Sequence, residues 1–201
     1  MNDAISSIPA SRPQPGEPVR YGPVAIGFHW VMVVLVVIVG ILGLLHDSWP
    51  HATQAFWINI HAMAGLTVWI LLMARLRWRW THRPPDLPPD VGEFSRRFSR
   101  PVHLLLYALM LVIPPIGIVT FIYHGRSFDF GLFQVDFHVH SNRDVFHPTE
   151  NVHGYVAYVL FGLIGLHVLA ALWHHFIRRD GVLLRMWPAA VSKPRDLGQH
   201  H

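Results

Sequence analysis

The sequence predicts an all-α fold: a transmembrane four-helix bundle whose helices run antiparallel, up and down, with both termini in the cytoplasm. Hydrophobic residues make up 52% of the 201 residues, whereas charged residues make up only 14%. The apolar residues gather in four stretches, each near or above the roughly 18 to 20 residues that cross a hydrocarbon core. Lysine and arginine are concentrated on alternate connections between these stretches, which is typical of multi-pass membrane proteins.

The first two spans lie in the N-terminal part of the chain. Residues 1–22 are rich in proline and poor in apolar residues, so we expect a disordered tail there. The first span is predicted at about 24–45 and the second at about 55–76. Only a short segment containing Asp47 and Pro50 separates them, so the second helix should return antiparallel to the first.

The third span is predicted at about 101–123, after a polar stretch from Arg77 to Arg100. The proline pairs in that polar stretch are incompatible with a continuous helix. We expect the third helix itself to be kinked at Pro114 and Pro115.

A longer polar loop, 124–150, leads to the fourth span, predicted at about 151–177. The predicted membrane domain therefore covers residues 23–188. A second disordered tail is expected at 189–201.

Basic residues indicate the orientation of the bundle. Seven arginines lie around the second connection: Arg75, Arg77, Arg79, Arg83, Arg96, Arg97 and Arg100. Five basic residues follow the fourth span: Arg178, Arg179, Arg185, Lys193 and Arg195. The first connection has none, and the third has only Arg126 and Arg143. The positive-inside rule then predicts that both termini are cytoplasmic.

Composition narrows the possible chemistry. The chain has no cysteine, which excludes disulfides, thiolate zinc sites, iron–sulfur clusters and covalent attachment of a c-type haem. Its formal net charge is +4, but the arginines lie beside the apolar stretches. Topology and anionic lipid explain them better than nucleic acid does, so we expect membrane lipid and no nucleic acid as a partner.

Four histidines lie inside the predicted spans at two matched depths. His29 is near the inner end of the first span, and His61 is near the outer end of the second. On the fourth span His153 and His167 are 14 residues apart, which is roughly 21 Å along a helix and within about 40° of one face. His153 can therefore meet His61, and His167 can meet His29, as two pairs stacked along the membrane normal.

Each pair could hold one haem iron through two axial ligands. A neutral imidazole offers a nitrogen lone pair to iron, and two such ligands leave no open position for oxygen. The pattern thus predicts two non-covalent b-type haems and a path for electrons across the bilayer. Alternatively, these histidines make interhelical hydrogen bonds or form a proton relay. For His103, on the third span, a role beside the inner haem, a quinone contact and a purely structural role all stay open.

Five short segments and a tail resemble the bacterial cytochrome b561 family, a group of four-helix di-haem, quinone-linked membrane proteins. The segments are Gly-Phe-His-Trp at 27–30, Ile-His-Ala-Met-Ala-Gly at 60–65, Pro-Val-His-Leu-Leu-Leu-Tyr at 101–107, Val-His-Gly-Tyr-Val-Ala-Tyr at 152–158, Gly-Leu-His-Val-Leu-Ala-Ala-Leu-Trp-His-His-Phe at 165–176 and Leu-Leu-Arg-Met-Trp-Pro at 183–188. The resemblance covers about 20–188 and is close to the subgroup similar to superoxide oxidase.

The resemblance implies a multi-pass protein of the bacterial cytoplasmic (inner) membrane. It also implies haem ligation by His29 with His167 and by His61 with His153, the pairing already predicted from depth. For the superoxide oxidase subgroup it further implies oxidation of superoxide at the outer face, with electrons delivered to ubiquinone.

His174 is a candidate quinone contact. It lies seven residues after His167, within about 20° of the same face and roughly 10 Å nearer the cytoplasm. Imidazole there could hydrogen-bond a quinone carbonyl and supply a proton when the quinone is reduced. An ordinary interfacial histidine is an equal alternative.

Three functions remain open from the sequence. The leading one is a free-standing di-haem cytochrome that exchanges electrons with the quinone pool, with superoxide as one candidate donor. A second is the haem b membrane anchor of a larger dehydrogenase or hydrogenase, which would require a redox partner protein. A third, of a different class, is a haem-free metal or proton transporter that uses the same histidines.

Overall fold

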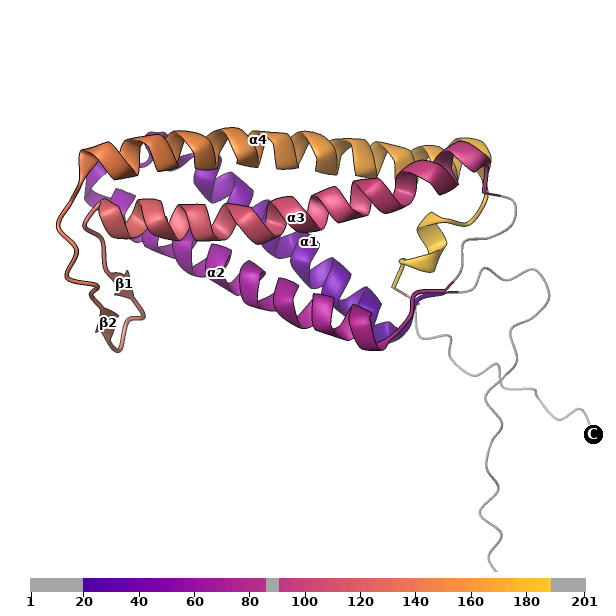
Figure 1. The fold of residues 1–201 in the computed structure, drawn as a ribbon, viewed down its shortest axis with the longest axis horizontal. Helices are drawn as coiled ribbons and strands as arrows, with labels where there is room; N and C mark the ends of the chain where they lie inside the picture. Colours follow the sequence, from indigo (N-terminus) through magenta and orange to yellow (C-terminus); the bar gives the residue numbers. More distant parts are fainter. Residues whose placement is uncertain (1–19, 86–90, 189–201) are drawn as a thin grey trace, which may run out of the picture.

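Four long helices dominate the computed structural model, which describes residues 20–85 and 91–188. They are α1 (Pro23–Leu44), α2 (His51–Thr81), α3 (Glu93–Tyr123) and α4 (Arg143–Trp173), and they run up and down along one long axis (Figure 1). The short elements are η1 (His46–Ser48), β1 (Phe128–Asp129), β2 (Gln134–Val135), the π-helical η2 (His174–Arg178) and η3 (Leu183–Arg185). The expected disordered tails are 1–22 and 189–201, of which 1–19 and 189–201 lie outside the described residues. Residues 20–22 are described, and Arg20 and Tyr21 are hydrogen-bonded to the segment after α4.

All four helices are long and apolar enough to cross a membrane. The spans are Pro23–Leu44, His51–Thr81, Ser95–Tyr123 and Arg143–Arg178. Many of their large apolar side chains are exposed, for example Leu104 at 70% and Leu169 at 63%. Such exposure is what hydrocarbon contact requires, because a lipid-facing surface must be apolar. The predicted transmembrane four-helix class is therefore confirmed.

The predicted boundaries of the polar stretch after the second span are wrong, because both neighbouring helices extend into it. Helix α2 continues to Thr81, and α3 begins at Glu93 and passes through Pro101 without interruption. Hydropathy marks only the apolar part of a helix, whereas the backbone hydrogen bonds continue into the polar headgroup region. Among the described residues of this connection, only 82–85 and 91–92 are non-helical.

The predicted loop before the fourth span is also shorter than expected, because α4 begins at Arg143 and not near residue 151. The Asn142 side chain caps this helix by accepting a hydrogen bond of 3.0 Å from the Asp144 main-chain N–H. A side-chain oxygen at this position satisfies one of the donors that a helix start leaves open. The extra turns of α4 place His153 well inside the helix.

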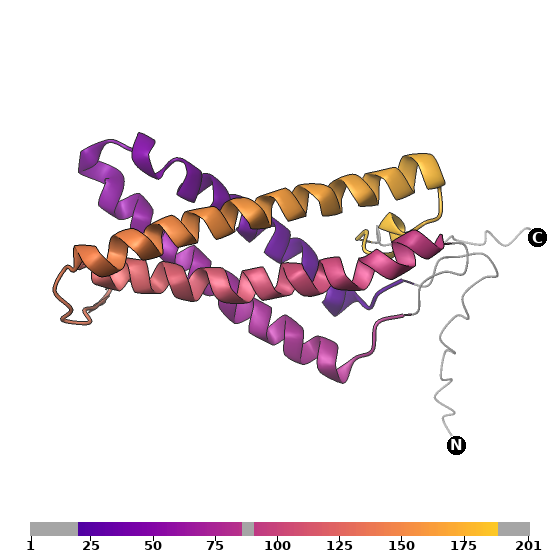
Figure 2. The ribbon, with the colours of Figure 1, turned by 45° about the horizontal axis from the view of Figure 1, so that its top comes forward.

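Helices that are consecutive in sequence pack together, so α1 contacts α2, α2 contacts α3, and α3 contacts α4. Figure 2 shows α4 also crossing α1. At this crossing Gly40 of α1 lies against the Phe161 ring of α4, where a β-carbon would overlap the ring. A small residue at such a crossing allows two membrane helices to approach closely.

The end of the bundle that carries 45–50 and 124–142 is called here the hairpin end. Strands β1 and β2 pair there as an antiparallel hairpin, which hangs beside the bundle (Figure 1). The Asn59 amide of α2 pins it by donating to the Asp129 carbonyl at 2.8 Å and accepting from the Asp129 N–H at 3.1 Å. Phe128 is buried with its ring centroid 4.5 Å from that of Phe121.

The opposite end, called the termini end, contains the start of α1, the start of α3 and the segment after α4. The Trp30 indole N–H of α1 donates to the Met186 carbonyl at 2.7 Å. The Tyr21 main-chain N–H donates to the Arg185 carbonyl at 3.1 Å. These bonds hold residues 185–186 against the beginning of α1.

Candidate functional site

His61 of α2 and His153 of α4 face each other at the hairpin end. Their ring centroids are 6.1 Å apart, and the ring planes are 81° from parallel. The His61 Nδ1–H donates to the Val39 carbonyl at 3.0 Å, and the His153 Nδ1–H donates to the Ile113 carbonyl at 3.1 Å. A proton on Nδ1 leaves the Nε2 lone pair available, which is the arrangement that metal-binding histidines adopt.

Two glycines leave the space that these rings occupy. A β-carbon at Gly43 would lie 2.9 Å from Cε1 of His61, and one at Gly117 would lie 2.8 Å from Cε1 of His153. Carbon atoms in contact normally lie about 3.5 to 4.0 Å apart. Each ring therefore occupies space that only glycine leaves free.

Both histidines line a cavity of about 290 Å³. Its lining is mainly apolar and includes the glycines Gly40, Gly43, Gly65, Gly117 and Gly154. A β-carbon at Gly65 or Gly154 would meet nothing within 4 Å, so the backbone there borders open space. A flat macrocycle between helices needs such room.

The dimensions of the pair fit a haem iron. Metal–imidazole bonds of about 2 Å place the two ligating nitrogens about 4 Å apart, with ring centroids roughly 6 Å apart. The observed separation of 6.1 Å matches this value. The donor set, the free Nε2 positions and the apolar cavity are thus all suited to a bis-histidine b-type haem.

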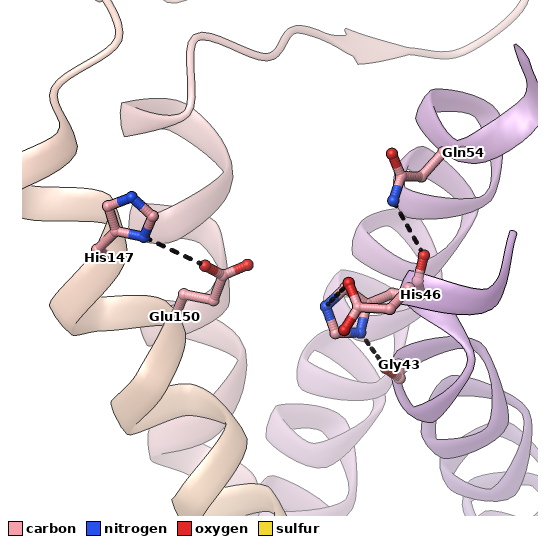
Figure 3. A network of polar contacts seen from close by, with 6 residues as sticks. Gly43, His46, Gln54, His147 and Glu150 are labelled. Atoms are coloured by element: carbon pink, nitrogen blue, oxygen red, sulfur yellow. Dashed lines mark hydrogen bonds and ion pairs between the residues drawn. The ribbon is translucent and has the colours of Figure 1, made fainter. Parts of the chain in front are cut away.

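Polar side chains line the hairpin-end mouth of the cavity: His46, His124, Arg126 and Glu150. Figure 3 shows His46 across from Glu150 and His147, which both lie on α4. His46 donates from Nδ1 to the Gly43 carbonyl at 2.9 Å, and Glu150 lies 3.9 Å from Nδ1 of His147. Burial lowers the pKa of the Arg126 guanidinium, and the nearby Glu150 carboxylate raises it.

A second histidine cluster lies toward the termini end. His167 of α4 contacts His103 of α3, with ring centroids 5.1 Å apart. The His103 Nδ1–H donates to the Ser99 carbonyl at 2.6 Å, so its lone pair is on Nε2. His29 of α1 is within electrostatic range of both rings. The structure therefore places His103 in contact with His167, and His29 in the same region of the bundle.

Arg75 also belongs to this cluster, although from the sequence it was assigned with the other arginines to topology and anionic lipid. Both terminal guanidinium nitrogens of Arg75 lie 3.4 Å from Nδ1 of His29. A guanidinium only donates, so His29 Nδ1 accepts in this arrangement. The guanidinium carbon also lies 5.7 Å from the centroid of the Tyr107 ring. An arginine six residues before the end of a long apolar helix was the available signal.

His174 lies in the π-helical turn after α4 and is only 7% exposed. Its Nδ1 is hydrogen-bonded to the Asp180 carboxylate, and its Nε2 is 2.9 Å from the Ser95 hydroxyl oxygen of α3. Asp180 and Ser95 were not singled out from the sequence. No motif marks them, because 85 residues separate them in the chain.

The chain is similar to known proteins over most of its length. The family model described as prokaryotic cytochrome b561 matches residues 20–189. Cytochrome b561 homolog 1 of Escherichia coli (strain K12) is 30% identical over 171 residues, which cover 84% of this chain and 97% of that protein. Probable superoxide oxidase CybB of Yersinia pestis is 30% identical over 170 residues, covering 84% and 96%. Cytochrome b561 homolog 2 of Escherichia coli (strain K12) is 29% identical over 176 residues, covering 84% and 92%.

Proposed function

Since this chain belongs to the prokaryotic cytochrome b561 family, we propose that it is a di-haem cytochrome that moves electrons across the membrane to or from the quinone pool. Membership, together with the four apolar spans, makes it a multi-pass protein of the bacterial inner membrane. It also makes the protein a b-type cytochrome. The number of haems, their ligands and the quinone connection are the proposed part.

The single observation that carries the proposal is the pair formed by His61 and His153. Two rings from different helices lie 6.1 Å apart at their centroids with both Nδ1 positions bound to main-chain carbonyls. These bonds fix the tautomer and the ring orientation before any ligand arrives, which reduces the free-energy cost of binding. Bound haem iron supplies reversible one-electron chemistry at this position.

For the second haem we propose His29 and His167 as ligands. His167 lies on the same helix as His153, roughly 21 Å farther along it, which separates the two centres along the membrane normal. Ligation through Nε2 of His29 requires a proton on Nδ1, so Arg75 must withdraw from its present position 3.4 Å away. His103 already has its lone pair on Nε2 and is the competing ligand.

The arginine distribution favours a cytoplasmic position for the termini end. The pair His61–His153 then lies near the outer face, and the pair His29–His167 lies near the inner face. The two centres would carry electrons from a donor outside the membrane to a quinone at the inner leaflet. One relative is named as a probable superoxide oxidase, so superoxide is the candidate donor and ubiquinone the candidate acceptor for this chain.

His174 is our candidate for the quinone contact on the cytoplasmic side. Its Nε2 is bonded to Ser95 and its Nδ1 to Asp180, so a quinone carbonyl would have to replace the serine hydroxyl. Asp180 then holds the imidazole in one orientation. Substitution His174→Ala should slow quinone reduction without changing haem content, and unchanged quinone kinetics would exclude this role.

An absorption spectrum with haem quantification tests the proposed cofactor set. The purified protein should contain two b-type haems per chain. His61→Ala and His153→Ala should each lose the same haem, whereas His29→Ala and His167→Ala should each lose the other. Two haems in all four variants would reject the ligand assignment, and a colourless protein expressed with ample haem would favour a transporter. Co-purification of a redox subunit would instead favour a membrane anchor.

A further inference from the structure

Arg126 stands out at the mouth of the cavity around His61 and His153. It follows α3 by three residues, and its main-chain N–H donates to the Phe121 carbonyl at 3.3 Å. The side chain is half-buried and lines the cavity, together with Glu150 and the two histidines. Arg126 therefore borders the space that we assign to a haem.

The guanidinium of Arg126 has no hydrogen-bond or ion-pair partner within residues 20–85 and 91–188. Glu150 attracts it electrostatically, but the carboxylate of Glu150 lies 3.9 Å from Nδ1 of His147 and forms no hydrogen bond or ion pair with Arg126 among the described residues. Figure 3 shows this carboxylate on the α4 side of the mouth. A half-buried cation that remains charged and unpaired is costly.

Arginine is suited to carboxylates, because its planar fork can donate two parallel hydrogen bonds to the two oxygens. A haem carries two propionate carboxylates on one edge. A haem held between His61 and His153 can direct this edge toward the polar mouth, because the rest of the cavity lining is mainly apolar.

We propose that Arg126 binds a propionate of the haem held between His61 and His153, which is called here the hairpin-side haem. The guanidinium would donate a charge-assisted hydrogen bond to the haem carboxylate. The proposal rests on the proposed His61–His153 haem. Arg143 has the same charge and lies in the same predicted connection, but it is exposed and does not line the cavity. Membrane topology alone therefore does not explain the position of Arg126.

A charge comparison between Arg126→Gln and Arg143→Gln tests the proposal on the haem-loaded protein in detergent. A glutamine side chain in place of Arg126 can still form hydrogen bonds but has no charge, so we expect the hairpin-side haem to dissociate about tenfold faster. Its reduction potential should fall, because a nearby cation favours the reduced, less positive iron. Arg143→Gln should leave both quantities at the wild-type value, and Arg126→Lys should lie between them.

Three outcomes separate the alternatives. Equal haem loss and equal potentials in Arg126→Gln and Arg143→Gln overturn the proposal. The proposal is also overturned if Arg126→Gln changes only the salt dependence of the reaction with superoxide. Arg126 would then attract the superoxide anion and would not bind a haem propionate. A wild-type protein that lacks a haem dependent on His61 and His153 refutes the proposed function instead, and this is established before either arginine is changed.

Discussion

Adding one methyl group at Gly117 should release a single haem. A β-carbon there would lie 2.8 Å from Cε1 and 3.0 Å from Nδ1 of His153. Since carbon contacts are comfortable at about 3.5 to 4.0 Å, the ring must move by roughly 0.7 Å or more. Metal–ligand distances tolerate only about 0.2 Å. We therefore expect Gly117→Ala to displace Nε2 of His153 from its ligand position.

The movement should also weaken the supporting hydrogen bond from His153 Nδ1 to the Ile113 carbonyl, which is already 3.1 Å long. Loss of such support typically reduces metal affinity about 10- to 100-fold. Haem dissociation is measured by transfer to an excess of a haem-free acceptor protein, followed by counting the haems that remain per chain. One of the two proposed haems should leave about 10 to 100 times faster than in the wild type.

Gly162→Ala is the matched control, because a β-carbon at Gly162 meets nothing within 4 Å. Both glycines lie inside long helices, so the gain in helix propensity is similar, about 1 kcal/mol. If Gly117→Ala retains both haems as long as Gly162→Ala does, the ring of His153 is not confined as described. The space left by Gly117 would then not determine whether His153 ligates a haem.

Three further predictions concern other contacts. His103→Ala should retain two haems if His29 is the ligand opposite His167, and loss of one haem on quantification would transfer the ligand role to His103. Asn59→Ala removes both bonds to Asp129, so proteases should cut the hairpin faster than in the wild type or in Thr53→Ala, and equal digestion would contradict this. Asp180→Ala leaves the buried His174 without its hydrogen-bond acceptor and should cost about 1 to 3 kcal/mol of stability; an unchanged thermal unfolding temperature would argue against this bond.

The helix class was predictable from the chain because a bilayer imposes one strong requirement. Each span must be apolar and must satisfy its own backbone hydrogen bonds, so about 20 apolar residues in sequence predict a helix. The ends were not predictable in this way. Helices α2, α3 and α4 extend into polar sequence, where hydropathy no longer distinguishes helix from loop.

The approach of His61 to His153 was predictable because depth in a membrane is set by position along a helix, at about 1.5 Å per residue. Rotation about the helix axis and lateral packing are not set by that count. Rotation and packing together decide that, among the described residues, His103 and not His29 has a ring contact with His167. The roles of Gly43 and Gly117 depend on them as well, since only the packed helices show which glycine lies against a ring.

The order of residues alone determined that the chain is a four-span membrane protein with histidines at two depths, because hydrophobic length and helical rise are properties of the local sequence. Only the tertiary structure decided which side chains share a space: Arg75 with His29, Asp180 and Ser95 with His174, and Arg126 with the cavity. These contacts join residues distant in the chain, and their geometry depends on how the helices pack.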